Sequence, residues 1–447
     1  MFHSAGAFLG SQSARQRIAV IGSGVSGLSA AWLLSQSHDV VLYEAENRLG
    51  GHANTIDVPG TGPVDTGFIV FNDRNYPNFK AMLGHLDVAS TSTEMSFAAS
   101  LDHGNFEYCG EGLAGMLGQR RNVFRPRFWS MLRDLLRFYR DAPSVLNQPE
   151  LRGMTLDEYL TSQRYSKSFV DDHLLPMAAA IWSSSASDIR AYPLFAFVRF
   201  FESHGLLVLT ERPLWRTVVG GSRSYVNALM AQFNGEVRLS TPVSALLRDA
   251  TGVTVRDAKG HTDRFDQVLV ATHADQALGM LETPTELESR LLGAFDYTRN
   301  LAVLHADTSL MPRRRRVWCC WNYISNDDID GGNLCVSYWM NKLQGFGGRD
   351  LFVTLNPPKD PAEEIARFDY THPLFDSKAI AAQEDLWRIQ GTNRTWYAGA
   401  HFGRGFHEDG LQAGLAAAEG MGSLPRPWIV PNQSGRITLA PPEALSA

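Results

Sequence analysis

The sequence predicts an α/β protein with two lobes, one built on a parallel sheet with its helices and one of mixed α+β character. Three observations lead to this fold class. An apolar run, a glycine-rich loop and a helical pattern follow one another within residues 17–35. The length of 447 residues exceeds what one hydrophobic core usually supports. The middle of the chain is mostly helical in pattern over residues 76–182 and contains strand-like runs after residue 300.

The first element is a short strand at residues 17–21, because its uninterrupted apolar letters RIAVI are typical of a buried parallel strand. A glycine-rich loop, Gly22–Gly27, follows directly, and residues 28–35 then show helical spacing. A second strand at residues 39–43 ends in Glu44. A strand, a G-x-G-x-x-G loop, a helix, a second strand and an acidic residue in this order indicate a dinucleotide-binding unit.

Each position in this unit has a physical reason. Gly22 permits a tight turn, Gly24 lets a diphosphate approach the backbone, and Gly27 allows the helix to pack closely on the strand. The N-terminus of the helix offers free N–H groups and a partial positive charge to the diphosphate. Glu44 can accept hydrogen bonds from a ribose diol, and its charge would repel a 2′-phosphate. The unit therefore predicts an adenine dinucleotide as cofactor.

The residues that follow indicate which dinucleotide is bound. Residues 45–52 read Ala-Glu-Asn-Arg-Leu-Gly-Gly-His. This segment resembles the second glycine signature of the flavin amine oxidase and phytoene desaturase superfamily, which implies FAD. The resemblance implies that Arg48, Gly50 and Gly51 contact the FAD diphosphate. The family usually has an arginine after the two glycines, where this chain has His52.

The resemblance extends from about residue 17 to residue 422. It implies a Rossmann-like FAD-binding domain of the glutathione-reductase type with a discontinuous α+β substrate domain, as in the amine oxidases. Residues 64–68 resemble the segment beside the flavin ring, residues 215–222 the return to the FAD domain, and residues 395–414 the closing FAD motif. The order of segments is most similar to a bacterial subgroup described as predicted NAD/FAD-binding proteins. That subgroup resembles the N-terminal flavoprotein part of plant cyclopropane fatty-acid synthases.

These motifs imply the residues that contact FAD. In the closing motif a helix N-terminus is expected to face the flavin, and there Asp409 is either a helix cap or a flavin contact. The residues expected to bind FAD are Gly22, Ser23, Gly24, Val25, Ser26, Gly27, Glu44, Ala45, Arg48, Gly50, Gly51, His52, Thr66, Gly67, Phe68, Val243, Ala271, Thr272, Gly399, Asp409, Gly410 and Leu411.

Two positions depart from the family pattern. The acid that commonly follows the strand-ending glycine and binds the ribityl chain is replaced by Ala400. The amine oxidases place a lysine near flavin N5, where it is linked to oxygen reactivity. In the register of residues 299–304 that position is Asn300. The loss of the lysine argues against rapid oxygen-dependent amine oxidation.

The resemblance divides the chain into two interleaved domains. Residues 17–75, 215–275 and 390–422 are expected to form the FAD-binding domain, and residues 76–214 and 276–389 the substrate domain. Residues 1–16 read as a disordered tail, and the proline-rich residues 423–447 as an arm that lies loosely over the surface. The substrate domain is rich in aromatic residues, which form either its core or the walls of a deep apolar tunnel.

Residues 125–140 show a basic, amphipathic helical pattern. Such a helix either packs on the protein with a solvated charged side or lies in an anionic lipid surface. Its apolar side is expected to comprise Phe128, Leu132, Leu135, Leu136 and Tyr139, and its basic side Arg133, Arg137 and Arg140.

The resemblance implies hydride transfer from a substrate C–H bond to flavin N5. Desaturation also requires a proton acceptor, for which motif position suggests His401, His407 and Glu408, although each also suits a role as a cap or hydrogen-bond partner. Asn300 completes the candidate catalytic set. The leading hypothesis is an FAD-dependent dehydrogenase or desaturase of an apolar, lipid-like fatty acyl substrate. The alternatives are a flavin amine oxidase that releases an imine and H₂O₂, and a non-redox use of FAD such as isomerisation.

Composition argues against several other classes. A formal net charge of −6 gives no reason to expect a nucleic-acid partner. The four cysteines are too few for a disulfide framework, and no spacing of His, Cys and acidic residues predicts a metal site. No apolar run reaches the roughly eighteen residues of a membrane span. We therefore expect a cytoplasmic protein, with peripheral contact at the inner membrane face if the basic helix binds lipid.

Overall fold

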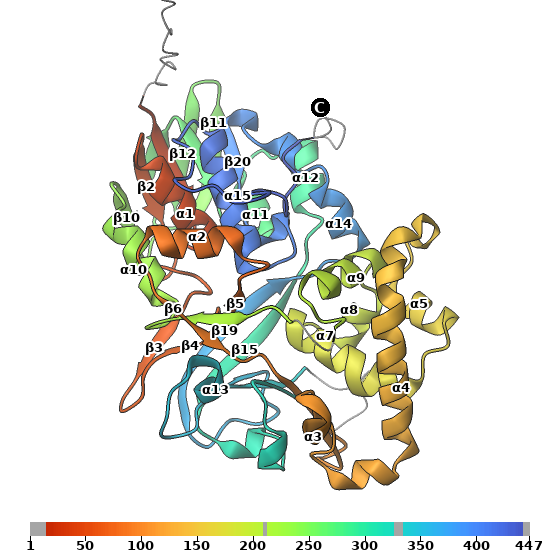
Figure 1. Ribbon diagram of the computed structural model, residues 1–447. Coiled ribbons are helices and arrows are strands. Elements are labelled where there is room, and N and C mark those ends of the chain that lie inside the picture. Colours follow the sequence, from red (N-terminus) through yellow and green to blue (C-terminus); the bar gives the residue numbers. More distant parts are fainter. Residues whose placement is uncertain (1–14, 209–211, 326–333, 441–447) are drawn as a thin grey trace, which may run out of the picture.

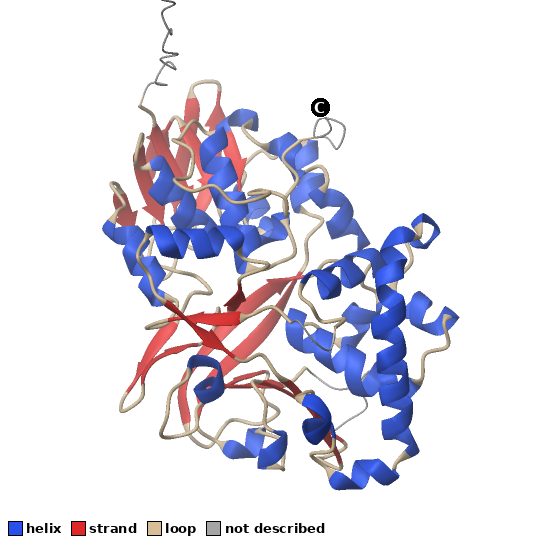
Figure 2. Ribbon diagram, viewed as in Figure 1, coloured by secondary structure: helices blue, strands red, loops and turns tan. Residues whose placement is uncertain are grey.

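The computed structural model describes residues 15–208, 212–325 and 334–440, which form two lobes (Figure 1). A parallel sheet with its helices builds one lobe, at the upper left of the view, and a mixed sheet with a cluster of helices builds the other (Figure 2). Residues 1–14 of the expected tail and 441–447 of the expected arm lie outside the described residues. Within the described ranges, no helix combines the length and hydropathy needed to traverse a bilayer.

The parallel-sheet lobe contains five strands, each parallel to its neighbours. Their order is β10 (Glu236–Arg238), β2 (Asp39–Tyr43), β1 (Arg17–Ile21), β14 (Gln267–Val270) and β20 (Thr395–Tyr397). β1 and β14 are central and almost wholly buried, which explains their continuous apolar letters. A three-stranded antiparallel sheet shares this core and comprises β11 (Val243–Asp249), β12 (Gly252–Asp257) and β13 (Thr262–Phe265). The predicted α/β class with a Rossmann-like sheet is confirmed.

Helices α1 (Val25–Leu34) and α15 (His407–Gly420) pack directly against each other in this lobe. Every residue of α1 is buried. A Cβ atom at Gly414 would collide with the carbonyl oxygen of Ser26, so the close approach of the two helices requires glycine. The core of the lobe also includes side chains from α2 (Pro77–His85), α10 (Arg223–Ala231), α11 (Ala274–Met280), α12 (Glu286–Leu292) and α14 (Ser377–Gln383).

The mixed-sheet lobe is built on one sheet of seven strands. The first two strands in the sequence come from the segment before residue 110 and the other five from the segment after residue 296. The two groups meet where β16 pairs with β7 in parallel, so both segments are needed to complete the sheet. The strand order is β19 (Glu364–Pro373), β15 (Tyr297–His305), β18 (Phe352–Leu355), β17 (Val336–Trp339), β16 (Trp321–Ile324), β7 (Phe97–Leu101) and β8 (Phe106–Cys109).

Two small sheets and two short helices complete this part of the fold. In Figure 1 one of the small sheets lies at the lower left and the other lies between the two lobes. One pairs β3 (Thr55–Val58) with β4 (Gly62–Asp65), and the other has the order β5 (Phe71–Asn72), β9 (Trp215–Val218), β6 (Ser90–Thr93). The short helices are α3 (Gly112–Met116) and α13 (Met340–Gln344).

A cluster of helices beside the mixed sheet has its own hydrophobic core. In α4, Phe128 and Leu135 are buried as expected, but Leu136 is 47% exposed and is not part of the buried side. The buried side instead includes Asp134, whose carboxylate accepts a hydrogen bond from the backbone N–H of Ser166. The helices are α4 (Pro126–Asp141), α5 (Leu156–Ser162), α6 (Lys167–Phe169), α7 (Leu175–Trp182), α8 (Ala186–Arg190) and α9 (Leu194–Ser203).

The C-terminal arm is anchored rather than loose over residues 423–440. The guanidinium group of Arg426 is buried and forms an ion pair with Glu419 at 2.8 Å. It also donates a hydrogen bond to the side-chain oxygen of Asn78 in α2. Arg436 forms an ion pair with the fully buried Asp409 at 2.6 Å. Two arginines therefore fix the arm to α2 and α15.

Candidate cofactor and active site

The first glycine turn connects β1 to α1. Gly22 has a φ of +96°, and a Cβ atom there would lie 2.7 Å from the carbonyl oxygen of Ala271. A Cβ atom at Gly27 would collide with the Gly22 carbonyl oxygen. Around Gly24, in contrast, a Cβ atom would meet nothing within 4 Å. Gly24 is also the N-cap of α1 and supplies no side-chain cap, so the N–H groups of the helix N-terminus face open space.

The second glycine turn lies against the first. A Cβ atom at Gly51 would be 3.1 Å from the Cα atom of Gly24, so the two turns are in backbone contact. Gly50 has a φ of +114°, which favours glycine. Arg48 donates a hydrogen bond to the carbonyl oxygen of Gly51 at 2.9 Å, which holds its guanidinium group beside the turn. Two backbone turns with their N–H groups and one arginine form a cradle that suits a diphosphate.

Further predicted contacts surround this cradle. The carboxylate of Glu44 accepts hydrogen bonds from the backbone N–H groups of Ser23 and Glu46, each at 2.8 Å. Thr272 follows β14 and lies beside the first glycine turn, where its methyl group would be 3.2 Å from a Cβ atom at Gly22. Ala45, Val25 and Ser26 occupy the adjoining loop and the first turn of α1, and Val243 begins β11.

The segment expected beside the flavin ring is packed between the lobes. A Cβ atom at Gly67 would collide with the His52 carbonyl oxygen, and that oxygen accepts the N–H of Phe68 at 2.7 Å. The ring of Phe68 stacks on His407 with centroids 3.7 Å apart. His407 Nε2 lies 2.6 Å from the Tyr225 hydroxyl group, and burial lowers the pKa of His407 to about 3. His407 is therefore a neutral imidazole at physiological pH.

At the start of α15, Asp409 has the first of the two roles that the sequence left open, that of a helix cap. Its carboxylate accepts the N–H of Phe406 at 2.8 Å, as a helix cap does, and it also pairs with Arg436. Gly410 lies against α1, where a Cβ atom would be 2.8 Å from Ser26 Oγ, and Leu411 is fully buried. With Asp409 engaged in this way, the first turn of α15 can still present its N–H groups to a flavin.

Two of the candidate proton acceptors, Glu408 and His401, are held by hydrogen bonds or ring packing within the protein. Glu408 is fully buried and receives hydrogen bonds from the backbone N–H groups of Asn78 and Phe79, at 3.1 and 2.9 Å, so it neutralises the N-terminus of α2. His401 packs against the rings of Phe295 and Phe402, and burial lowers the pKa of His401 to about 3. Gly399 is extended at this point and directly precedes the turn that carries Ala400 and His401.

Asn300 belongs to a buried polar cluster that the sequence did not reveal. Its amide nitrogen lies 3.1 Å from the Ser183 carbonyl oxygen and 3.1 Å from His372 Nδ1. Asn356 donates a hydrogen bond to the Asn300 amide oxygen at 2.7 Å. The ring of His372 is 5.4 Å from that of His52. β19 supplies His372 and pairs with β15 next to Asn300, but no local pattern in the sequence marks this pairing.

The cluster reaches the segment expected beside the flavin through Tyr370. The hydroxyl group of Tyr370 lies 2.9 Å from both Thr66 Oγ1 and Asn54 Nδ2, and its ring stacks on His52. Burial lowers the pKa of His372 to about 4, and burial together with neighbouring histidines lowers the pKa of His52 well below its usual value. Two neutral imidazoles therefore lie where the lobes meet.

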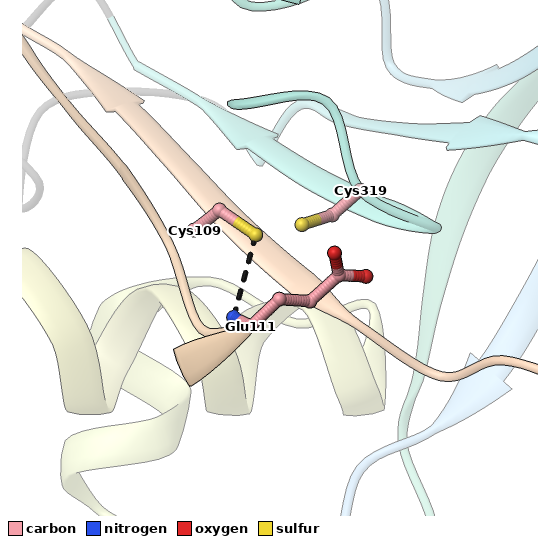
Figure 3. A group of neighbouring side chains, drawn as sticks. All are labelled: Cys109, Glu111 and Cys319. Carbon is pink, nitrogen blue, oxygen red and sulfur yellow. Dashed lines mark hydrogen bonds between the residues drawn. The ribbon is translucent and has the colours of Figure 1, made fainter. Parts of the chain in front are cut away.

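A second group of polar side chains lies outside this cluster. Cys109, Glu111 and Cys319 converge beside the edge strand β8 (Figure 3). Their ligand-type atoms all lie within 4.8 Å of one another. The spacing of cysteine and acidic residues along the chain predicted no metal site, because Cys319 reaches the other two only through the pairing of distant strands.

The fold and the glycine cradle define the class of protein, an FAD-dependent oxidoreductase. The model of the flavin containing amine oxidoreductases matches residues 25–318, more than half of the chain. The chain belongs to that family, whose cofactor is FAD. No curated protein matches the chain.

Solved structures give the same fold. A CLA-producing fatty acid isomerase from P. acnes matches with a TM-score of 0.65 and 14% identity, over 92% of this chain and 98% of the other. Putrescine oxidase bound to putrescine matches with a TM-score of 0.64 and 12% identity, over 91% and 99%. Cyclohexylamine oxidase from Brevibacterium oxydans IH-35A matches with a TM-score of 0.64 and 15% identity, over 91% and 99%. At these identities the likeness carries the fold alone.

Proposed function

We propose that this oxidoreductase removes a hydride from a C–H bond of an apolar, lipid-like substrate such as a fatty acyl chain, as a dehydrogenase or desaturase. FAD, when bound, supplies the hydride acceptor at flavin N5. The observation that carries the proposal is the fixed, uncharged side chain of Asn300 at the position that the resemblance aligns with the amine oxidase lysine.

Asn300 cannot replace a lysine chemically. Its amide has no charge and does not titrate in the physiological range, whereas a lysine is a mobile cation. Both polar atoms of Asn300 already have partners in Ser183, His372 and Asn356. This supports a reaction in which reduced FAD passes its electrons to an acceptor other than oxygen.

An aromatic run supports an apolar substrate. Phe406, which directly precedes α15, stacks on Phe200 of α9 with centroids 5.0 Å apart. Phe200 is in turn 4.6 Å from Trp182. These rings extend from the turn expected to face the flavin into the helical cluster. If an acyl chain lies along these rings, each of its methylene groups that is buried would contribute about 0.8 kcal/mol to the binding free energy.

We assign to His372 the role of a hydrogen-bond donor that orients the substrate, with Asn300 as its positioning residue. The lowered pKa of His372, about 4, keeps its imidazole uncharged at neutral pH. The Asn300 amide nitrogen donates to Nδ1, so the neutral ring carries its single proton on Nε2 and offers a hydrogen-bond donor there. His407 and Glu408 are engaged by Tyr225 and by the N-terminus of α2, which supports structural roles for them.

Anaerobic incubation of the FAD-loaded protein with fatty acyl lipids tests the proposal. We expect bleaching of the bound flavin and a product that has lost two hydrogen atoms, measured by mass spectrometry. An acyl product of unchanged mass with a shifted double bond would instead indicate isomerisation. Absence of any change in the lipids, together with turnover of amines, would reject the proposed substrate class.

His372→Gln tests the role assigned to His372. We expect turnover to fall by about 5- to 10-fold with retained FAD, because the loss of one orienting hydrogen bond costs about 1 kcal/mol. His305→Gln is the matched control, since His305 is buried on β15 and bonded only to structural partners such as Thr354. Equal losses in both variants would show that the effect is structural.

The second candidate is a flavin amine oxidase. The family description and the solved amine oxidases of the same fold favour it. Aerobic assays with mono- and polyamines that follow H₂O₂ release distinguish the two activities. Rapid peroxide formation with an amine would make this the better description of the enzyme.

We also propose a peripheral contact with anionic lipid, made by residues 120–129 rather than by the basic side of α4. Phe124 is 87% exposed and Trp129 is 51% exposed, and the Trp129 indole N–H bonds to the carbonyl oxygen of Val123. Within the described ranges, neither Arg120 nor Arg121 has an ion-pair partner. Aromatic and basic side chains interleaved in this way suit a charged membrane surface.

Co-sedimentation with phosphatidylcholine vesicles, with and without phosphatidylglycerol, tests this contact. Binding is expected only with the anionic lipid, and we expect it to be lost in a Phe124→Ser, Trp129→Ser double variant. Ile429→Ser is the matched control because Ile429 is 96% exposed elsewhere, on the C-terminal arm. Binding that survives the double variant would exclude residues 120–129 as the contact.

A further inference from the structure

Cys109 and Cys319 are buried thiols that take no part in the candidate active site. Cys109 ends β8, and Cys319 lies just before β16. Asn322 fixes the backbone of Cys319, because it accepts the N–H of Cys319 at 2.9 Å and donates to its carbonyl oxygen at 2.7 Å. Figure 3 shows the two sulfur atoms pointing toward each other. The fold therefore holds two thiols face to face.

Glu111 brings a third donor to the same point. Glu111 lies two residues after Cys109, and its backbone N–H donates to Cys109 Sγ at 3.4 Å. The two sulfur atoms and a carboxylate oxygen lie within 4.8 Å of one another. Two thiolates bound to one tetrahedral zinc ion at about 2.3 Å lie roughly 3.8 Å apart. The spacing of the donors thus fits a single ion.

We propose that Cys109, Cys319 and Glu111 form a zinc site with three protein ligands and one exchangeable position. Two thiolates select a thiophilic ion, and zinc accepts a carboxylate beside them. Zinc binding would release the two thiol protons, so the complex of Zn²⁺ with two thiolates and one carboxylate carries a single negative charge.

Lys342 offsets part of the negative charge around the site. Its ammonium group is paired with the Glu111 carboxylate and lies 2.9 Å from Glu94 Oε2. Because a carboxylate has two oxygen atoms, Glu111 can keep the ammonium group on one and offer the other to the ion. The lysine thus acts as an outer partner that orients a ligand.

Glu111 also gives the site access to solvent. It lines an open pocket of about 470 Å³ together with Glu94, Ser96 and neighbouring residues. The two cysteines are buried and do not line the pocket themselves. An ion can therefore enter from the pocket, and its fourth position would face the same side. When bound, zinc would join edge strand β8 to the segment before β16, across β7.

Metal analysis of the FAD-loaded protein tests the proposal. The protein is reduced with a phosphine, stripped with EDTA and titrated with Zn²⁺ against a competing chelator. We expect one zinc ion per chain by elemental analysis. X-ray absorption is expected to show two sulfur neighbours at about 2.3 Å and lighter atoms at about 2.0 Å. The affinity should fall by at least about 100-fold in Cys109→Ser or Cys319→Ser and by about 10-fold in Glu111→Gln.

Cys335→Ser is the matched control, since Cys335 is equally buried but outside the group. It should bind zinc as the unaltered protein does, and circular dichroism and FAD content should report an intact fold in every variant. The proposal is overturned by absence of zinc binding, by a zinc environment of oxygen and nitrogen alone, or by equal loss in Cys335→Ser. A Cys109–Cys319 disulfide that resists the reductant would overturn it as well.

Discussion

Asp65 is buried at the end of β4, where one carboxylate connects three parts of the chain. It accepts hydrogen bonds from the backbone N–H of Ser222 at 2.9 Å, from Thr55 Oγ1 at 2.6 Å and from Gln344 Nε2 at 3.1 Å. Despite these donors, burial raises the pKa of Asp65 to about 6. The segment expected beside the flavin, residues 64–68, therefore contains a group that titrates within the physiological range.

This titration predicts a pH-dependent stability. The unfolded pKa is about 3.9, so the folded protein holds a proton on Asp65 more tightly than the unfolded chain does. The resulting stabilisation is complete below about pH 4 and is lost as the pH rises through about 6. Between pH 5 and pH 7 the loss is about 1 kcal/mol.

Asp65→Asn removes the titrating group. We expect the difference between the free energies of unfolding at pH 5 and pH 7 to change by about 1 kcal/mol relative to the unaltered protein. Urea unfolding at the two pH values measures it. The same pH dependence in both proteins would mean that Asp65 does not titrate in this range.

At the scale of elements, the two glycine turns form the cofactor cradle, and Gly24 is the position where they touch. A methyl group at Gly24 would meet no protein atom, so Gly24→Ala is expected to fold normally. The methyl group would instead occupy the path of the diphosphate. We predict that FAD affinity falls at least about tenfold, a change of about 1.4 kcal/mol, while the melting temperature of the apoprotein is unchanged.

Fluorescence titration of the apoprotein with FAD measures this affinity. Gly279→Ala is the matched control, because Gly279 lies in α11 and also has open space around a Cβ atom. Its FAD affinity should equal that of the unaltered protein. Undiminished FAD binding by Gly24→Ala would show that the diphosphate does not bind at this position.

The elements that the sequence predicted well are those set by local patterns. β1, the first glycine turn, α1 and β2 lie within residues 17–43, where strand and helix periodicities and a motif coincide. The pairing of β16 with β7 joins distant segments, and no periodicity encodes it. The proximity of Cys109 to Cys319 and of His52 to His372 could not be predicted for the same reason, because each pair comes from segments that are distant in the sequence. Leu136 was misplaced because α4 buries Asp134, which an amphipathic pattern counts as solvated.

At the scale of the whole molecule, the C-terminal arm closes the parallel-sheet lobe. Arg436 is the cation beside Asp409, which is fully buried at the start of α15. Removal of one partner of a buried pair leaves an uncompensated charge, which costs about 3–5 kcal/mol. We therefore expect Arg436→Met to lower the free energy of unfolding by that amount, measured by urea denaturation.

Arg349→Met provides the comparison, because Arg349 pairs with Glu363 on the exposed surface. Exposed pairs contribute about 0–1 kcal/mol, so this variant should be nearly as stable as the unaltered protein. Adding Asp409→Asn to Arg436→Met should restore part of the loss. If Arg436→Met proved harmless, the arm would not be needed to stabilise α15.

The packing of α15 on α1 has a consequence for biosynthesis. The first glycine turn is translated well before α15, the helix that packs on α1. A growing chain therefore contains the first glycine turn and α1 before α15 is present to pack against them. Cofactor loading therefore requires residues 407–420 to have been synthesised, and a translation product that stops before residue 407 would be colourless.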